Sequence, residues 1–301
     1  MRAVALAALC ALLLAAPAGA QSTANPTADS ADVGMPGGFS GRGPAAHLKA
    51  AEAAAFAKQI ERDLAARHAH VAIVFRAGRS RKDLPDNIAY THGAFWVYGE
   101  TTGADGKTYK GYAVYNLYQG DGKSLPETQS YLAQDYPIDF VAGSQADDVG
   151  VIIPSPEMQR RIENIINSPS YEKLHIKSYT LVSNPFDAKH QNCTEFLLDV
   201  VSAAAWQTDD YAQIKANLKA HFTPTIVHAN LLERIFGPVF DPRLNLDDQD
   251  GDIETAEYAS IARFMTDNGL LQESYVLDFA RSSAAQAPRN GSDGQSPLPN
   301  P

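Results

Sequence analysis

A short turn between two strand-like segments constrains the fold of this chain most. Residues 88–98 and 110–118 are rich in β-branched and aromatic side chains, as in strands of a partly buried sheet. The connection Thr101–Lys107 contains Asp105-Gly106, a dipeptide typical of tight hairpin turns. Strands joined by so short a turn pair antiparallel. The sequence therefore predicts an antiparallel hairpin.

The spacing of apolar residues predicts the other elements. Helical spacing occurs over residues 46–67, 155–167, 208–220, 225–236 and 253–267, and another amphipathic helix is predicted to begin near Cys193. Further strands are predicted over residues 70–75, 134–140 and 179–182. This order of elements predicts an α+β fold, in which an antiparallel sheet packs against helices and additional helices follow at the C-terminal end.

Both terminal regions are predicted to lie outside the folded domain. Residues 1–20 have a basic start, an apolar run and an Ala-x-Ala ending, the pattern of a cleaved signal peptide. Residues 21–44 have the composition of a flexible linker, and residues 283–301 that of a disordered tail. We therefore expect one domain over residues 45–282, in a periplasmic or secreted protein without stable membrane insertion.

Charge and motif content exclude several functions. The chain has 25 basic and 35 acidic residues and a formal net charge of −10, which argues against binding nucleic acid. No phosphate-binding glycine loop and no metal-spaced His/Cys cluster is present, so we expect no cofactor and no metal. The acidic run 247–252 partly resembles a calcium loop, but Leu246 stands where the first ligand is required. We predict a solvated acidic turn that caps the last helix.

The most informative residue for function is Cys193. The other cysteine, Cys10, lies in the predicted signal peptide, so an exported protein would keep a single thiol. Asn192 is a good N-cap residue, which places Cys193 at the start of a helix. The helix dipole there favours the thiolate and lowers the thiol pKa. Cys193 is therefore a candidate nucleophile; the alternative is a small buried apolar residue.

A nucleophilic thiol requires a histidine as base and, usually, a third polar group that orients the imidazole. His92 and His70 lie on predicted strands, whereas His190 directly precedes the Cys193 helix. We favour His92 because Gly93 beside it allows another segment to approach closely. The hypothesis requires that sulfur and imidazole meet across a cleft.

A basic segment follows the first predicted strand. It contains Arg76, Arg79, Arg81 and Lys82 and is predicted to form an exposed loop near the site. Such a loop is able to recognise a carboxylate or a phosphate.

Several longer runs point to a known family. They are Phe75–Arg79, Tyr90–Phe95, Gly111–Tyr118, Tyr136–Phe140, Asn184–Phe186 and Gln191–Glu195. Together, over about residues 55 to 270, they resemble an uncharacterised bacterial family, domain of unknown function 2145. The order of His92 and Cys193 also resembles the circularly permuted NlpC-type branch of the papain-like fold.

The second resemblance implies roles for individual residues. Cys193 would be the nucleophile, His92 the base, and Asn116 the third polar residue, with Gln119 as second choice. That branch contains cell-wall peptidases, amidases and lipid acyl-transferring enzymes. We therefore expect a cysteine hydrolase or acyltransferase acting on a small-molecule, peptide or lipid substrate of the cell envelope. The alternative is a non-catalytic periplasmic binding or assembly protein that keeps the fold.

Overall fold

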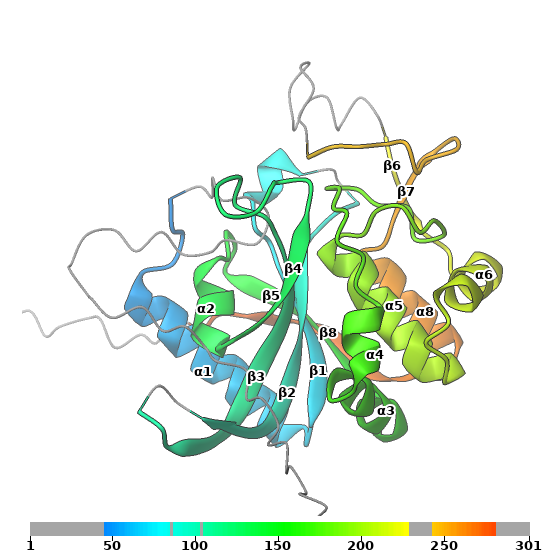
Figure 1. The fold of residues 1–301 in the computed structure, drawn as a ribbon. Coiled ribbons are helices and arrows are strands. Elements are labelled where there is room, and N and C mark those ends of the chain that lie inside the picture. Colours follow the sequence, from blue (N-terminus) through cyan, green and yellow to red (C-terminus); the bar gives the residue numbers. More distant parts are fainter. Residues whose placement is uncertain (1–44, 85–86, 103–104, 229–242, 281–301) are drawn as a thin grey trace, which may run out of the picture. The chain divides into compact units, whose positions relative to one another are not determined.

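The computed structural model describes residues 45–84, 87–102, 105–228 and 243–280. Its main element is a six-stranded antiparallel sheet with the strand order β4-β3-β2-β1-β5-β8 (Figure 1). The strands are β1 (Val71–Arg76), β2 (His92–Thr102), β3 (Thr108–Gln119), β4 (Ser130–Asp135), β5 (Asp148–Pro154) and β8 (Leu271–Asp278). A separate two-stranded sheet joins β6 (Thr225–Val227) to β7 (Ile253–Thr255).

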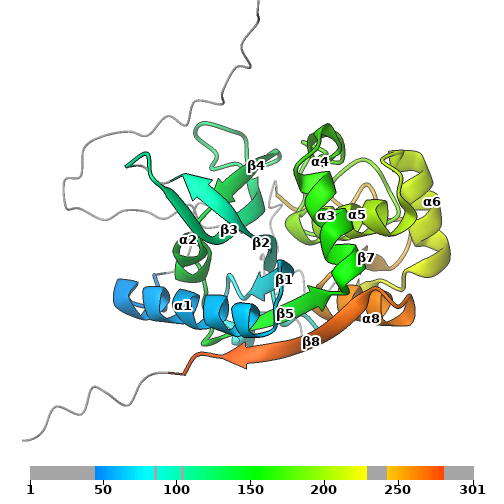
Figure 2. The same ribbon diagram turned by 90° about the horizontal axis from the view of Figure 1, so that it is seen from below.

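The helices cover the two faces of the sheet unequally (Figure 2). They are α1 (Ala50–Ala66), α2 (Pro137–Ala142), α3 (Pro156–Ile166), α4 (Pro169–Lys173), α5 (Cys193–Trp206), α6 (Tyr211–His221) and α8 (Tyr258–Asp267), with a short 3-10 turn, η1 (Arg81–Asp83). On one face, α1 and α2 pack on a core that contains Trp96 and Phe140. On the other face, α3, α5 and α8 enclose a second core around Phe75 and Leu197. None of the helices in the described segments is apolar over a length that would cross a bilayer.

The predicted hairpin is present, and the sheet extends further than expected. β2 pairs with β3 from Thr102↔Thr108 to Phe95↔Tyr115. β5 was not predicted, although it is buried along its whole length between β1 and β8. β8 was not predicted either, because Glu273 on its less exposed face and Val276 on its exposed face break the apolar–polar alternation of a strand.

Three predicted elements are wrong in part. The strand expected over residues 134–140 ends at Asp135, and α2 begins at Pro137, since proline suits the first turn of a helix. The strand expected over residues 179–182 is irregular, with only an isolated bridge at Ser178. Residues 225–227 form β6 instead of starting a helix, and residues 229–242 lie outside the described segments.

The last predicted helix also begins later than expected. Residues 253–255 form β7, and α8 starts at Tyr258 with Glu257 as its N-cap. The helix is followed by Gly269, whose φ of 66° is the left-handed conformation that glycine adopts without strain. The predicted signal peptide (1–20), linker (21–44) and tail (283–301) lie outside the described residues.

Candidate functional site

Helix α5 places Cys193 at its first residue, as predicted. The Asn192 side chain caps the helix, since its Oδ1 accepts a hydrogen bond from the Glu195 N–H at 2.9 Å. The thiol is 2% exposed, and its sulfur lies 3.7 Å from the carbonyl oxygen of Thr91. The backbone N–H of Gly93 lies close enough to the sulfur to lower its pKa. Cys193 therefore lies against the two residues that flank His92.

Gly93 makes this close approach between α5 and β2 possible. A Cβ atom at this position would lie 2.6 Å from Leu197 Cδ1 and 2.8 Å from the Phe75 ring. Both distances are shorter than carbon atoms in contact allow, so a side chain at this position would force Leu197 of α5 or Phe75 of β1 to shift. The expected close approach at Gly93 is thus made by α5 itself.

His92 belongs to a buried polar chain on β2, β3 and β4. Its Nε2 lies 3.0 Å from Asn116 Oδ1, and Asn116 Nδ2 donates to Asp135 Oδ2 at 3.0 Å. The Tyr118 hydroxyl donates to the same carboxylate oxygen at 2.5 Å. The imidazole stacks on the Tyr118 ring and packs against Phe140. The ring is therefore fixed in position and held by an amide that is itself held by a carboxylate.

The thiol and the imidazole are not joined. Among the described residues, no hydrogen bond connects the Cys193 sulfur with the His92 ring. Successive residues of a strand face opposite sides of the sheet, and a side chain at Gly93 would meet Leu197 of α5. The His92 ring instead packs against Phe140, which belongs to the core under α1 and α2. The structure brings His92 and Asn116 together and leaves Cys193 beside the backbone of β2.

Burial is the main cause of the pKa shifts of the Cys193 thiol and the His92 imidazole. It raises the pKa of the Cys193 thiol to about 11, although Arg76 and nearby backbone N–H groups act in the opposite direction. The lowered thiol pKa expected from the helix start is therefore wrong for this conformation, because desolvation outweighs the helix dipole. Burial and, secondarily, Arg76 lower the pKa of His92 to about 3. At neutral pH both groups are uncharged.

Arg76 lies beside His92 in the site and not in an exposed loop. It was expected in an exposed loop, but it ends β1, pairs in register with His92 and is 1% exposed. Its Nη1 donates to the carbonyl of Gly143, and its guanidinium lies 5.3 Å from the centre of the Phe140 ring. The sequence signal for the burial of Arg76 was its position directly after an apolar strand. Of the same basic segment, Arg81 pairs with Asp148 at 2.5 Å.

The alternative residues have other partners or positions. His70 is exposed and precedes β1, at the end of the strand opposite to Arg76. His190 has Nδ1 2.7 Å from Ser178 Oγ and Nε2 2.6 Å from Asp247 Oδ1, so both ring nitrogens are engaged. Gln119 donates to the carbonyl of Glu127 at 2.7 Å. Of the candidates, His92 and Asn116 alone share a hydrogen bond within the described segments.

The acidic run 247–252 is a mostly exposed turn, as predicted, but Asp248 is an exception and the run does not cap the last helix. Asp248 is buried, and its carboxylate accepts a hydrogen bond from the Asn184 N–H at 2.9 Å. It therefore holds the loop before α5, while α8 is capped by Glu257. In the part of the chain that the structure describes, no group of His, Cys, Asp and Glu side chains is arranged to hold a metal ion.

Comparison with known proteins identifies a family. Neither the curated proteins nor the solved structures include a match to the chain. The model of a family described as uncharacterised proteins conserved in bacteria, DUF2145, matches residues 63–265, which include Cys193, His92, Asn116, Asp135 and Arg76. The match covers more than half of the chain, and the chain therefore belongs to the bacterial family DUF2145.

Proposed function

We propose that this protein is an exported thiol hydrolase or acyltransferase of the permuted NlpC-type, papain-like class. Cys193 is the nucleophile, His92 the base and Asn116 the residue that orients the base. The observation that carries the proposal is convergence: the first residue of α5 contacts the backbone on both sides of His92, whose ring is held 3.0 Å from Asn116. These residues are far apart in the sequence.

The hydrogen bonds of Asn116 define which nitrogen of His92 acts as the base. Asn116 Nδ2 is bound to the Asp135 carboxylate, so Oδ1 is the atom that faces the ring. Oδ1 accepts only, and Nε2 must therefore carry the hydrogen. Nδ1 then has a free lone pair and, among the described residues, no hydrogen-bond partner. Nδ1 is the atom that would take the thiol proton, which requires the ring to move from the Phe140 side of the sheet to the α5 side.

The reaction requires that the site opens. The largest cause of both pKa shifts is burial, so access of water or of a polar substrate lowers the pKa of Cys193 and raises that of His92. Sulfur then attacks a carbonyl carbon while Nδ1 takes its proton and returns it to the leaving group. Backbone N–H groups at the start of α5 are placed to stabilise the oxyanion. The substrate class is an ester or amide, with envelope peptides and lipids as the first candidates.

One observation favours the alternative function. Cys193 and His92 are 2% and 1% exposed, and both are neutral at pH 7 in this conformation. A non-catalytic binding or assembly protein would keep such a closed site permanently. The difference between the two functions is therefore whether the thiol ever becomes accessible to an acyl donor.

Acylation of the native protein tests the proposal. The protein is incubated with p-nitrophenyl esters and thioesters of short acyl chains, and acyl groups are located by peptide mass spectrometry. We expect acylation of Cys193 that is lost in Cys193→Ser and slowed at least tenfold in His92→Ala and Asn116→Ala. The exposed residue His70 supplies the control variant His70→Ala, which should react as wild type. If Cys193 is acylated only after unfolding in urea, the proposal is wrong and the binding protein is favoured.

A further inference from the structure

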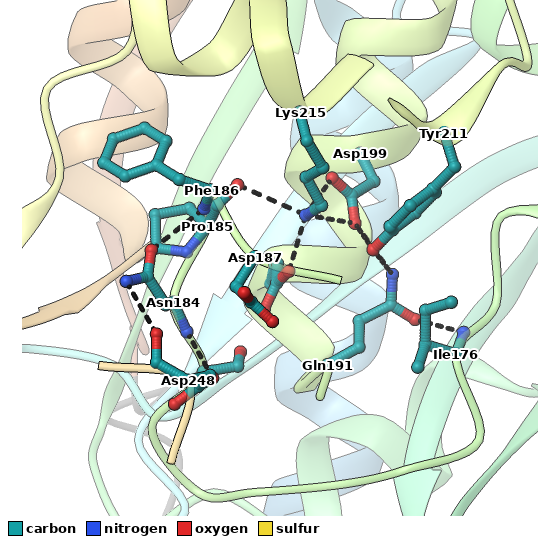
Figure 3. Close-up of polar contacts among 12 residues, drawn as sticks. Ile176, Asn184, Pro185, Phe186, Asp187, Gln191, Asp199, Tyr211, Lys215 and Asp248 are labelled. Carbon is teal, nitrogen blue, oxygen red and sulfur yellow. Dashed lines mark hydrogen bonds and ion pairs between the residues drawn. The ribbon is translucent and has the colours of Figure 1, made fainter. Parts of the chain in front are cut away.

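A second group of buried charged side chains lies between α5 and α6 (Figure 3). Lys215 of α6 places its Nζ 2.6 Å from Glu195 Oε1 and 2.8 and 3.1 Å from the two carboxylate oxygens of Asp199. The fourth contact is the carbonyl of Pro185, at 3.2 Å. The Lys215 side chain is 7% exposed, and both acidic side chains are fully buried. The amine therefore faces a carboxylate in an environment without bulk water.

The hydrogen bonds indicate how the protons are distributed. Asp199 Oδ2 also accepts from the Tyr211 hydroxyl at 2.9 Å and from Gln191 Nε2 at 2.8 Å, which stabilises the ionised form. Glu195 Oε2 is buried and has no hydrogen-bond partner among the described residues. Burial raises the pKa of Glu195 to about 8. The group thus contains an ammonium, a carboxylate and a neutral carboxylic acid.

We propose that Lys215 and Asp199 condense into an amide, an intramolecular isopeptide bond that joins α5 to α6, with Glu195 as the proton shuttle. The inference goes beyond the proposed hydrolase or transferase function and does not depend on it. Lys215 Nζ is nearly equidistant from the two oxygens of Asp199, so it faces the carboxyl carbon that it would attack.

The reaction balances without another reactant. A proton passes from the ammonium to Asp199 Oδ1, which yields a neutral amine and a neutral acid. The Nζ lone pair then forms the C–N bond, and Glu195 accepts a second proton from nitrogen and delivers it to Oδ1. The C–O bond breaks and Oδ1 leaves as water, which carries two of the three ammonium protons. Glu195 regains its initial state, and the amide keeps one N–H.

The surroundings oppose the first proton transfer and favour the later steps. Burial lowers the pKa of Lys215, but Asp199 and Glu195 outweigh burial and raise it above its usual value. An ion pair loses much of its advantage over the neutral amine and acid when water is excluded. Because the fold already holds the amine and the carboxyl group together, the reaction avoids the loss of translational and rotational entropy. In well-oriented systems this corresponds to effective concentrations of about 10⁵ M or more. Tyr211 and Gln191 donate to Asp199 Oδ2, the oxygen that becomes negative in the tetrahedral intermediate.

The same chain contains a matched control pair. Lys173 Nζ lies 2.7 Å from Asp209 Oδ1, but these side chains are 58% and 42% exposed. Their charges are solvated, and the pKa of Asp209 is lowered by the hydrogen bond from Lys173. We expect no amide at this pair, although its N–O distance of 2.7 Å is close to the 2.8 Å of the buried pair.

Mass spectrometry of the purified full-length protein tests the inference. We expect an intact mass lower by one water molecule than the sequence requires. Trypsin should not cleave after the acylated Lys215, so residues 190–219, which contain both reacting side chains, should appear as one peptide that is lighter by one water. Lys215→Met and Asp199→Ala should show the full mass. Glu195→Gln keeps both reacting groups and the side-chain shape, and should slow the reaction at least tenfold.

Three results would overturn the inference. The first is a folded wild-type protein with unmodified Lys215 and Asp199 after prolonged incubation. The second is a loss of water that maps elsewhere, for example to a succinimide. The third is loss of water from peptide 190–219 of Glu195→Gln at the wild-type rate, which would remove Glu195 from the reaction. Because the wild-type measurement is decisive alone, misfolding of a variant does not prevent the test.

Discussion

Replacing Gly93 by alanine should loosen the contact on which the site depends. The added methyl group would lie 2.6 Å from Leu197 Cδ1 and 2.8 Å from the Phe75 ring, in a region without free space. Overpacking of this kind costs about 1–3 kcal/mol. Lower entropy of the unfolded chain offsets about 0.4–1 kcal/mol of that cost. We therefore expect Gly93→Ala to reduce the free energy of unfolding by about 1–2 kcal/mol.

A double-mutant cycle with Leu197 tests the cause. Leu197→Ala alone leaves a cavity and should cost about 2–5 kcal/mol. In the Gly93→Ala background the new methyl group occupies part of that cavity, so the second substitution should cost at least about 1 kcal/mol less than it does alone. The measurement is equilibrium unfolding in urea, with the midpoint compared at constant slope.

Gly99 provides the control on the same strand. A Cβ atom at this position has no atom within 4 Å, so Gly99→Ala should leave stability unchanged or slightly raised. The same samples report on the site, because displacement of α5 should make Cys193 alkylation in Gly93→Ala several-fold faster. Additive effects at Gly93 and Leu197, within about 0.5 kcal/mol, would show that this contact does not determine the packing.

Three further results are expected. The pKa of His92 is lowered to about 3 in the folded state, against about 6.5 unfolded, so stability should fall as pH decreases below 6.5, by up to about 2 kcal/mol at pH 5. In urea titrations, His92→Gln should weaken this pH dependence of the free energy of unfolding, whereas the variant of the exposed residue, His70→Gln, should not. An equal pH dependence in wild type and both variants would show that His92 does not cause it. Iodoacetamide should modify Cys193 slowly at pH 7 and about tenfold faster per pH unit up to the thiol pKa of about 11, as followed by peptide mass spectrometry; the rate of an exposed thiol at pH 7 would refute this. Asn192→Ala removes the cap of α5 and should cost about 1 kcal/mol of unfolding free energy in urea, and no loss would mean that water replaces the cap.

Local patterns in the sequence were sufficient for much of the fold. The Asp105-Gly106 turn predicted the β2–β3 hairpin, and Asn192 predicted the start of α5 at Cys193. Both signals depend on a few adjacent residues. β8 escaped prediction because Glu273 and Val276 interrupt its apolar–polar alternation, and its place beside β5 depends on distant parts of the chain.

The sequence indicated residues of the site, but not their contacts or their protonation. The hydrogen bond between His92 and Asn116 joins residues on adjacent strands, and the resemblance pointed to both of them. The pKa of Cys193 was misjudged because its burial depends on how tightly α5 packs on Gly93, which no local pattern reports. The partners of Asn116 in β4, above all Asp135, depend on strand register and were missed for the same reason.

The two segments that lie mostly beyond the family match support one another. The match covers residues 63–265, whereas α1 begins at Ala50 and β8 ends at Asp278. Gln59 Nε2 donates to the Asp278 carbonyl at 2.8 Å, and Phe56 stacks on Phe279. A fragment trimmed to the matched residues would strip α1 from its core and leave an open β5 edge, a surface prone to aggregation. The autonomous folding unit is thus longer than the part by which the family is recognised, and expression boundaries should include both segments.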